Sequence, residues 1–233
     1  MYKTLVMKEL RETALIWGFA VAAIAYAIFS VLIGANRLSF EGVPLLGWIM
    51  QQASLSGFNR NFIFLDAGLE TKFTTMSVLF TIGVGLLQTL GESVRGTYPF
   101  LLHRPMSRRR IIAVKLAVGT GVYLGISGGA ILILGLWSAT PGTHPSPFEW
   151  SMTAGVWRIW IVMPIFYFGA FLTGIRPARW YGSRLFPLIA AVFFYFLASS
   201  FPNGFASNAA MTILIVACFT VCIFVASEDR DYS

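Results

Sequence analysis

Apolar stretches close to the length of a membrane span recur along this chain and constrain its fold more than any other feature. A helix needs about 20 apolar residues to cross the hydrocarbon core of a bilayer. The chain of 233 residues is 57% hydrophobic and only 12% charged. It therefore predicts an all-α, polytopic membrane protein with one transmembrane domain. Six stretches qualify as transmembrane helices, at residues 14–34, 73–90, 111–137, 151–174, 185–201 and 209–226.

Positive charge falls mainly on one side of this six-span layout. The formal net charge is +7, and in membrane proteins Lys and Arg collect in cytoplasmic loops, where they set the orientation. Thirteen of the 17 Lys and Arg residues lie on this side: twelve in the two tails and in the loops after the second and fourth spans, and Lys115 at the start of the third span. We therefore expect a multi-pass cell membrane protein, of the bacterial inner membrane, with both termini in the cytoplasm. The charge is topogenic, so we expect membrane lipid as a partner and no nucleic acid. The other four basic residues fall on the outer side: Arg37, Arg60, Lys72 and Arg158.

Two segments outside the spans have distinct patterns. The N-terminal segment predicts an amphipathic helix that lies along the membrane interface; the alternative is a frayed extension of the first span. Residues 35–72 mix turn residues with aromatic side chains, which favours a compact external segment whose function the sequence does not indicate. In the N-terminal helix, apolar and charged residues fall on opposite sides: Tyr2, Val6, Met7 and Leu10 against Lys8, Arg11 and Glu12.

Small residues recur every four positions in the third span. Such a stripe lets a second helix approach closely, so we expect it to form a helix-packing surface within one subunit or between two. The two cysteines, Cys218 and Cys222, lie one helical turn apart in the last span, where we expect them in the core. The stripe consists of Ala113, Ala117, Gly121, Gly125 and Gly129.

Polar side chains inside the second and fourth spans are candidates for a substrate path. Hydroxyl and amide groups are costly to expose to lipid without partners, so Thr81 and Gln88 should face protein or water. Arg158 lies among tryptophans near the start of the fourth span, which Pro164 is expected to kink. Two interpretations of Arg158 stay open: it extends to the membrane surface, or it lines the path.

Catalytic motifs are missing from the sequence. It contains no Gly-Lys pair, so the phosphate-binding Walker loop is absent. Ser127 lies in a segment similar to that of intramembrane serine proteases, but His103 and His144 fall in loops beyond its reach. Carboxylates occur only at the edges of the spans, which disfavours ion-coupled transport. We expect neither an enzyme nor a cofactor in this chain, and we expect energy from another subunit.

The segment 92–110, between the second and third spans, combines apolar and basic residues. Gly96 permits a tight reversal, and Pro105 ends or begins a short helix. Leu101, Leu102 and Met106 offer an apolar face among arginines. We predict a cytoplasmic coupling helix that docks on a partner, although the arginines also suit acidic lipid headgroups.

The order of these residues resembles the cytoplasmic segment of ABC-2 type transporter permeases. That resemblance implies an exporter subunit that forms a homodimer or heterodimer and binds two cytoplasmic ATPase subunits, which hold ATP and Mg. Tyr98-Pro99 departs from the pattern, since many members carry an acidic residue there. The alternative is a non-transporting scaffold or sensor whose basic loop binds lipid or a regulatory protein. The implied ATPase-coupling residues are Glu92, Arg95, Gly96, Thr97, Leu101, Leu102, Arg104, Pro105, Met106, Arg108, Arg109 and Arg110.

Overall fold

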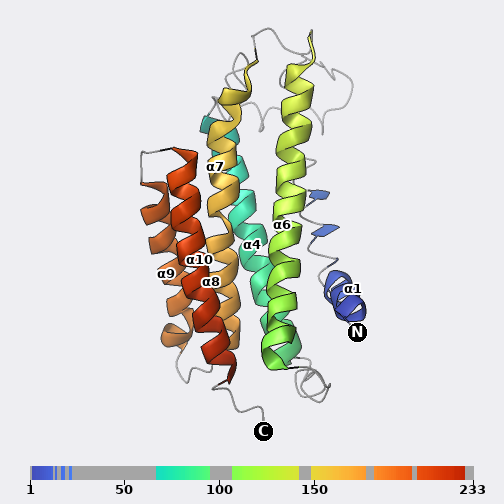
Figure 1. Ribbon diagram of the computed structural model, residues 1–233, viewed down its shortest axis with the longest axis vertical. Coiled ribbons are helices and arrows are strands. Elements are labelled where there is room, and N and C mark those ends of the chain that lie inside the picture. The colour runs from blue at the N-terminus through green and yellow to red at the C-terminus, as the bar shows by residue number, and fades with distance from the viewer. Residues whose placement is uncertain are drawn as a thin grey trace, which may run out of the picture.

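The computed structural model describes residues 2–12, 14, 17–18, 21–22, 67–94, 107–141, 148–176, 181–200 and 204–228. Within these ranges the chain is helical and contains no strand. Figure 1 shows the long helices side by side, with α1 seen nearly end-on beside the lower end of α6. The helices are α1 (Tyr2–Glu12), α4 (Ala67–Val94), α6 (Arg108–Ala139), the 3₁₀ helix η1 (Trp150–Thr153), α7 (Ala154–Val162), α8 (Pro164–Ile175), α9 (Tyr181–Ser199) and α10 (Phe205–Glu228).

Four helical stretches in the described part are long and apolar enough to cross a membrane. The apolar part of α9, Ser183–Ser199, is shorter. Most of the predicted first span, 14–34, lies outside the described residues, and its described residues 14, 17–18 and 21–22 are helical. The structure therefore supports a helical membrane protein, while the count of six spans stays a prediction. The four stretches are Leu69–Leu90, Arg108–Ala139, Trp150–Ile175 and Phe205–Glu228.

The helices extend beyond the apolar stretches that predicted them. α4 begins at Ala67, so the last six residues of the predicted external segment 35–72 are helical, and residues 35–66 lie outside the described ranges. α6 has 32 residues, which gives a length of about 48 Å against a hydrocarbon core of about 30 Å. Hydropathy marks the part of a helix that lipid surrounds. It does not mark where the backbone hydrogen bonds stop.

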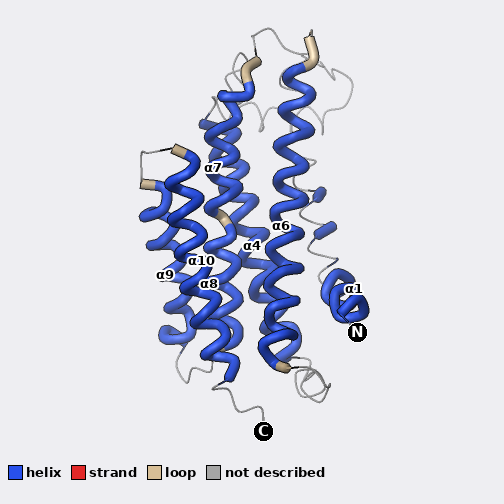
Figure 2. Tube along the Cα trace, in the orientation of Figure 1, coloured by secondary structure: helices blue, strands red, loops and turns tan. Residues whose placement is uncertain are grey.

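The centre of the bundle is α8, in which every residue from Pro164 to Ile175 is buried. It packs chiefly against α4, α9 and α10. A helix that is apolar on all sides is typical of a core position. Its first residue is Pro164, where the sequence predicted a kink, and Met163 separates it from α7. Figure 2 marks this break as a short non-helical segment between α7 and α8.

Aromatic side chains of η1, α7 and α8 pack directly against glycines of α6. A Cβ atom at Gly119 would overlap the Tyr167 ring, and one at Gly135 would lie 2.7 Å from Trp150. At Gly128 the Trp160 indole packs closely and donates its Nε1 hydrogen to the Leu124 carbonyl at 3.1 Å. These contacts fix α6 against η1, α7 and α8.

The predicted small-residue stripe is not this packing surface. Ala113, Ala117, Gly121 and Gly125 are exposed, and a Cβ atom at Gly121, Gly125 or Gly129 would meet no described atom within 4 Å. A spacing of four drifts around a helix by about 40° per step, because a turn takes 3.6 residues. The packed positions instead combine spacings of three and four, as at Leu116, Gly119, Tyr123, Ser127 and Ala130.

The last helix places its most polar side inward. Buried positions of α10 include Asn208 and Thr212, whereas Ile213 and Leu214 are more than 60% exposed. Cys218 and Cys222 are exposed, so the predicted core position of the cysteines is wrong. Because lipid tails are as apolar as leucine, the apolar character of a residue does not say which way it faces.

Candidate functional sites

An ion pair attaches α1 to the bundle. The Glu9 carboxylate of α1 lies 3.2 Å from the Lys115 ammonium in the second turn of α6, and the two side chains are 1% and 2% exposed. Met7, on the apolar side of α1 that was predicted to lie along the membrane interface, is 60% exposed. The side of α1 that packs against the bundle contains a charged residue, Glu9. A buried charge needs an opposite charge close by, and Lys115 provides it.

The ion pair continues into a hydrogen-bonded cluster, which we call the polar junction. It consists of Glu9, Gln88, Lys115 and Tyr167, one residue each from α1, α4, α6 and α8, and all four are buried. The Lys115 ammonium donates to the Gln88 backbone carbonyl at 3.3 Å. The Tyr167 hydroxyl shares its hydrogen between Gln88 Oε1 at 2.7 Å and the Lys115 carbonyl at 3.1 Å. The junction therefore joins four helices through polar contacts at one end of the bundle.

Two of the three predicted substrate-path residues, Thr81 and Gln88, are buried between helices. Gln88 belongs to the polar junction. Thr81 is 1% exposed, and its hydroxyl donates to the Ser77 carbonyl one turn earlier, at 2.7 Å. Such a bond to the backbone is a common way for threonine to satisfy its hydroxyl within a helix. Among the described residues, neither Thr81 nor Gln88 lines the pocket that contains Arg158.

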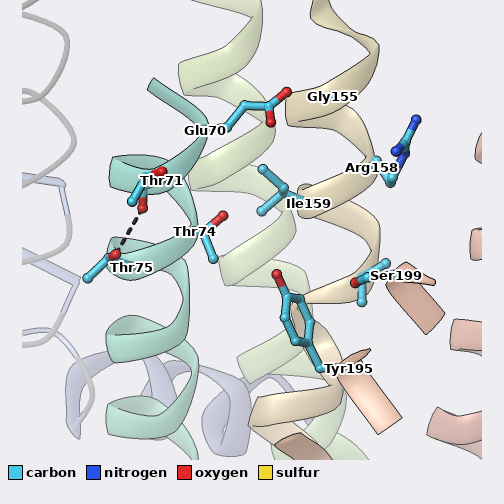
Figure 3. Close-up of a pocket in the computed structure, with 10 residues that line it drawn as sticks. Glu70, Thr71, Thr74, Thr75, Gly155, Arg158, Ile159, Tyr195 and Ser199 are labelled. Atoms are coloured by element: carbon cyan, nitrogen blue, oxygen red, sulfur yellow. Dashed lines mark hydrogen bonds between the residues drawn. The ribbon is translucent and has the colours of Figure 1, made fainter. Parts of the chain in front are cut away.

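The third, Arg158, lines a cavity of about 440 Å³ between α4, α7 and α9, shown in Figure 3. Within the described ranges, neither Arg158 nor Glu70 has an ion-pair or hydrogen-bond partner. An acid and a base thus line the cavity without being bonded to each other, and in Figure 3 the Arg158 guanidinium points away from Glu70. The cavity lining is Glu70, Thr71, Thr74, Thr75, Gly155, Arg158, Ile159, Val162, Tyr195 and Ser199.

Glycine and aromatic packing shape this pocket. Glu70 points at Gly155 of α7 (Figure 3), and a Cβ atom there would overlap the Glu70 carboxylate. The Tyr195 ring is held by Phe166 and Phe196, with centroid distances of 5.2 and 5.5 Å. Its hydroxyl points toward the space between α4 and α7 in Figure 3. Glu70 and Tyr195 were not predicted as site residues, because no local pattern distinguishes them.

The predicted ATPase-coupling residues are described only at the two ends of their segment. Glu92 falls in the last turn of α4, and residues 95–106 lie outside the described part of the chain. Arg108, Arg109 and Arg110 form the exposed first turn of α6. Arg109 Nε donates to Glu228 Oε1 at 2.5 Å, which joins the start of α6 to the end of α10. The two side chains are 67% and 47% exposed, so water screens the pair.

Comparison with known proteins identified no relative of this chain. No protein-family model matches the chain, and neither does any curated protein or solved structure. The functional interpretation therefore depends on the residues of this chain and on their geometry.

Proposed function

We propose that this chain is the membrane-spanning permease subunit of an ABC transporter of the ABC-2 type, an exporter driven by ATP hydrolysis in a separate cytoplasmic ATPase. The order of residues from Glu92 to Lys115 suggests the family. Four helices long and apolar enough to span a membrane provide the scaffold that such a subunit requires. In this proposal ATP and Mg belong to the partner, and a second permease chain, identical or different, completes the path.

The observation that carries the proposal is the position of the polar junction around the segment 92–110. Gln88 lies shortly before this segment in α4, and Lys115 lies shortly after it in α6. Both residues bond to Tyr167 of the central helix, and Lys115 also pairs with Glu9 of α1. A displacement of the segment would therefore act on four helices together.

This arrangement suggests how an ATPase would move the permease. Docking on the apolar residues Leu101, Leu102 and Met106 would transmit a push to the ends of α4 and α6. The junction would carry that push to α8, which packs against α4, α9 and α10. The bundle would then shift against its partner chain as a unit, in the manner of other two-state transitions. Substrate would move along the dimer interface.

Purification of the complex tests the proposal. The tagged full chain is isolated from membranes of its host in mild detergent, and co-purifying ATPase activity is measured. Leu102→Asp combined with Arg108→Glu, Arg109→Glu and Arg110→Glu should abolish that activity. Arg176→Glu, a charge reversal in another basic loop, should leave it intact. Full activity with the combined variant would show that the segment is not the docking element.

A second candidate function is a scaffold that binds anionic lipid, and the exposed first turn of α6 favours it. Arg108, Arg109 and Arg110 are all exposed, and such clusters attract acidic headgroups by about 1 kcal/mol per residue. If this is their role, the same triple reversal lowers association with anionic nanodiscs, and the wild-type chain co-purifies with no ATPase.

A further inference from the structure

The pocket between α4, α7 and α9 holds two opposite charges that the protein itself does not pair. Arg158 is exposed and Glu70 is half-buried, and neither bonds to any residue in the described ranges. The polar junction shows that this bundle can bring an acid and a base together when it packs them. The separation in the pocket therefore leaves two charges available to a ligand.

The hydroxyl groups of the pocket are also available. Elsewhere in the bundle, Thr89 and Thr173 donate to the carbonyl four residues earlier, at 2.9 and 2.8 Å. Thr74, Tyr195 and Ser199 make no such hydrogen bond to any residue that the structure describes. Unsatisfied polar groups are unfavourable in a membrane protein, so water or a ligand must satisfy these three.

We propose that this pocket binds a zwitterionic group, with Glu70 contacting its ammonium and Arg158 contacting its anionic oxygens. A ligand with one charge would leave the opposite side chain unpaired, whereas a group that carries both an ammonium and anionic oxygens satisfies both. The volume of about 440 Å³ lies in the range of small-molecule sites. The pocket hydroxyls suit the polar atoms of the ligand, and Ile159 and Val162 supply apolar contact.

Two sources provide this chemistry: the headgroup of a zwitterionic lipid and a free zwitterion. The site goes beyond the proposed transport function, since binding needs no ATPase and is measured on the purified chain alone. A missing ATPase therefore leaves this proposal standing, and an empty pocket leaves the transporter proposal standing.

Calorimetry with O-phosphoethanolamine, in uncharged detergent, tests the charge requirement. We expect it to bind at least about tenfold more tightly than inorganic phosphate or ethanolamine, because each lacks one charge-assisted contact. Glu70→Gln and Arg158→Gln should each weaken binding about tenfold or more. Gly155→Ala should also weaken it, because the new Cβ displaces the Glu70 carboxylate while the charge remains. The matched controls, Glu149→Gln and Arg176→Gln, remove the same charges outside the pocket and should bind as the wild type does.

The lipid arm uses nanodiscs that contain equal amounts of phosphatidylethanolamine and phosphatidylglycerol, with retained lipid identified by native mass spectrometry. Retention of phosphatidylethanolamine that Glu70→Gln and Arg158→Gln abolish, without binding of the free probe, identifies a lipid headgroup. Binding of the free probe identifies a soluble zwitterion. If neither form binds in a way that depends on Glu70 and Arg158, or if phosphate alone binds equally well, the proposal is wrong. Melting curves of all variants confirm that each is folded.

Discussion

The polar junction and the pocket contain the same kinds of residue in opposite arrangements. In the junction, Glu9 and Lys115 lie 3.2 Å apart and almost fully buried. In the pocket, Glu70 and Arg158 share one cavity without an ion pair. The first arrangement holds helices together, and the second leaves charges for something that is not protein. The surroundings of a charge, rather than its presence in a span, thus separate a structural role from a binding role.

The strongest way to break this contrast is to remove one partner of the junction. Glu9→Gln or Lys115→Met leaves a buried charge without its partner, which costs about 3–5 kcal/mol. We expect a large loss of thermal stability in detergent, together with faster proteolysis of the N-terminal helix. The double variant should recover part of the loss, which a double-mutant cycle measures. An unchanged melting temperature in either single variant would show that the pair does not hold α1.

A smaller effect is expected where α6 meets the tyrosine of the junction. Gly119→Ala forces a Cβ atom into the Tyr167 ring, and overpacking of this kind costs about 1–3 kcal/mol. Gly121→Ala is the matched control two residues away, where a Cβ atom meets no described atom within 4 Å. That control should stabilise the helix by about 0.5–1 kcal/mol. Chemical or thermal unfolding separates the two, and equal effects would contradict the packing of this face.

The Tyr167 hydroxyl should contribute less than the ion pair. Tyr167→Phe keeps the ring between α6 and α8 but removes the hydrogen bond to Gln88 Oε1. A hydrogen bond between neutral groups contributes about 1 kcal/mol, so the melting temperature should fall modestly while the N-terminal helix stays protected. A loss as large as that of Lys115→Met would mean that the tyrosine, and not the ion pair, organises the junction.

The smallest effect on stability is expected in the pocket. Glu70→Gln and Arg158→Gln remove charges that have no described partner, so each should change the free energy of unfolding by less than about 0.5 kcal/mol. Thermal melts without added zwitterion measure this. Strong destabilisation by either change would assign the pocket charges to the fold instead of to a ligand.

Much of the architecture could be predicted from the sequence. Apolar stretches of the right length indicated a helical membrane protein, and Pro164 marked the break between α7 and α8. The central place of α8 was also detectable in principle, because its residues are apolar on every side. The direction that each helix faces could not be predicted in the same way. Lipid and protein core are equally apolar, so Cys218 and Cys222 gave no sign of facing outward.

The sites were harder to predict because their partners are distant in the sequence. On a helical projection Glu9 lies about 60° from Val6, so it borders the apolar side of α1. Burial of Glu9 depends on its ion pair with Lys115, which lies more than a hundred residues later in the sequence. Arg158 was recognised as a candidate from its span alone, but Glu70 acquires its place only when α4 packs beside α7.

Carbodiimide labelling of the purified chain compares the two carboxylates in a single experiment. Glu9 and Glu70 are coupled to glycine ethyl ester in mild detergent, and mass spectrometry follows the extent of labelling at each over time, with exposed Glu149 as the reference. We predict that Glu70 is labelled readily, while Glu9 stays unlabelled until the chain unfolds. Equal labelling of Glu9 and Glu70 in the folded protein would contradict the distinction between a closed junction and an open site.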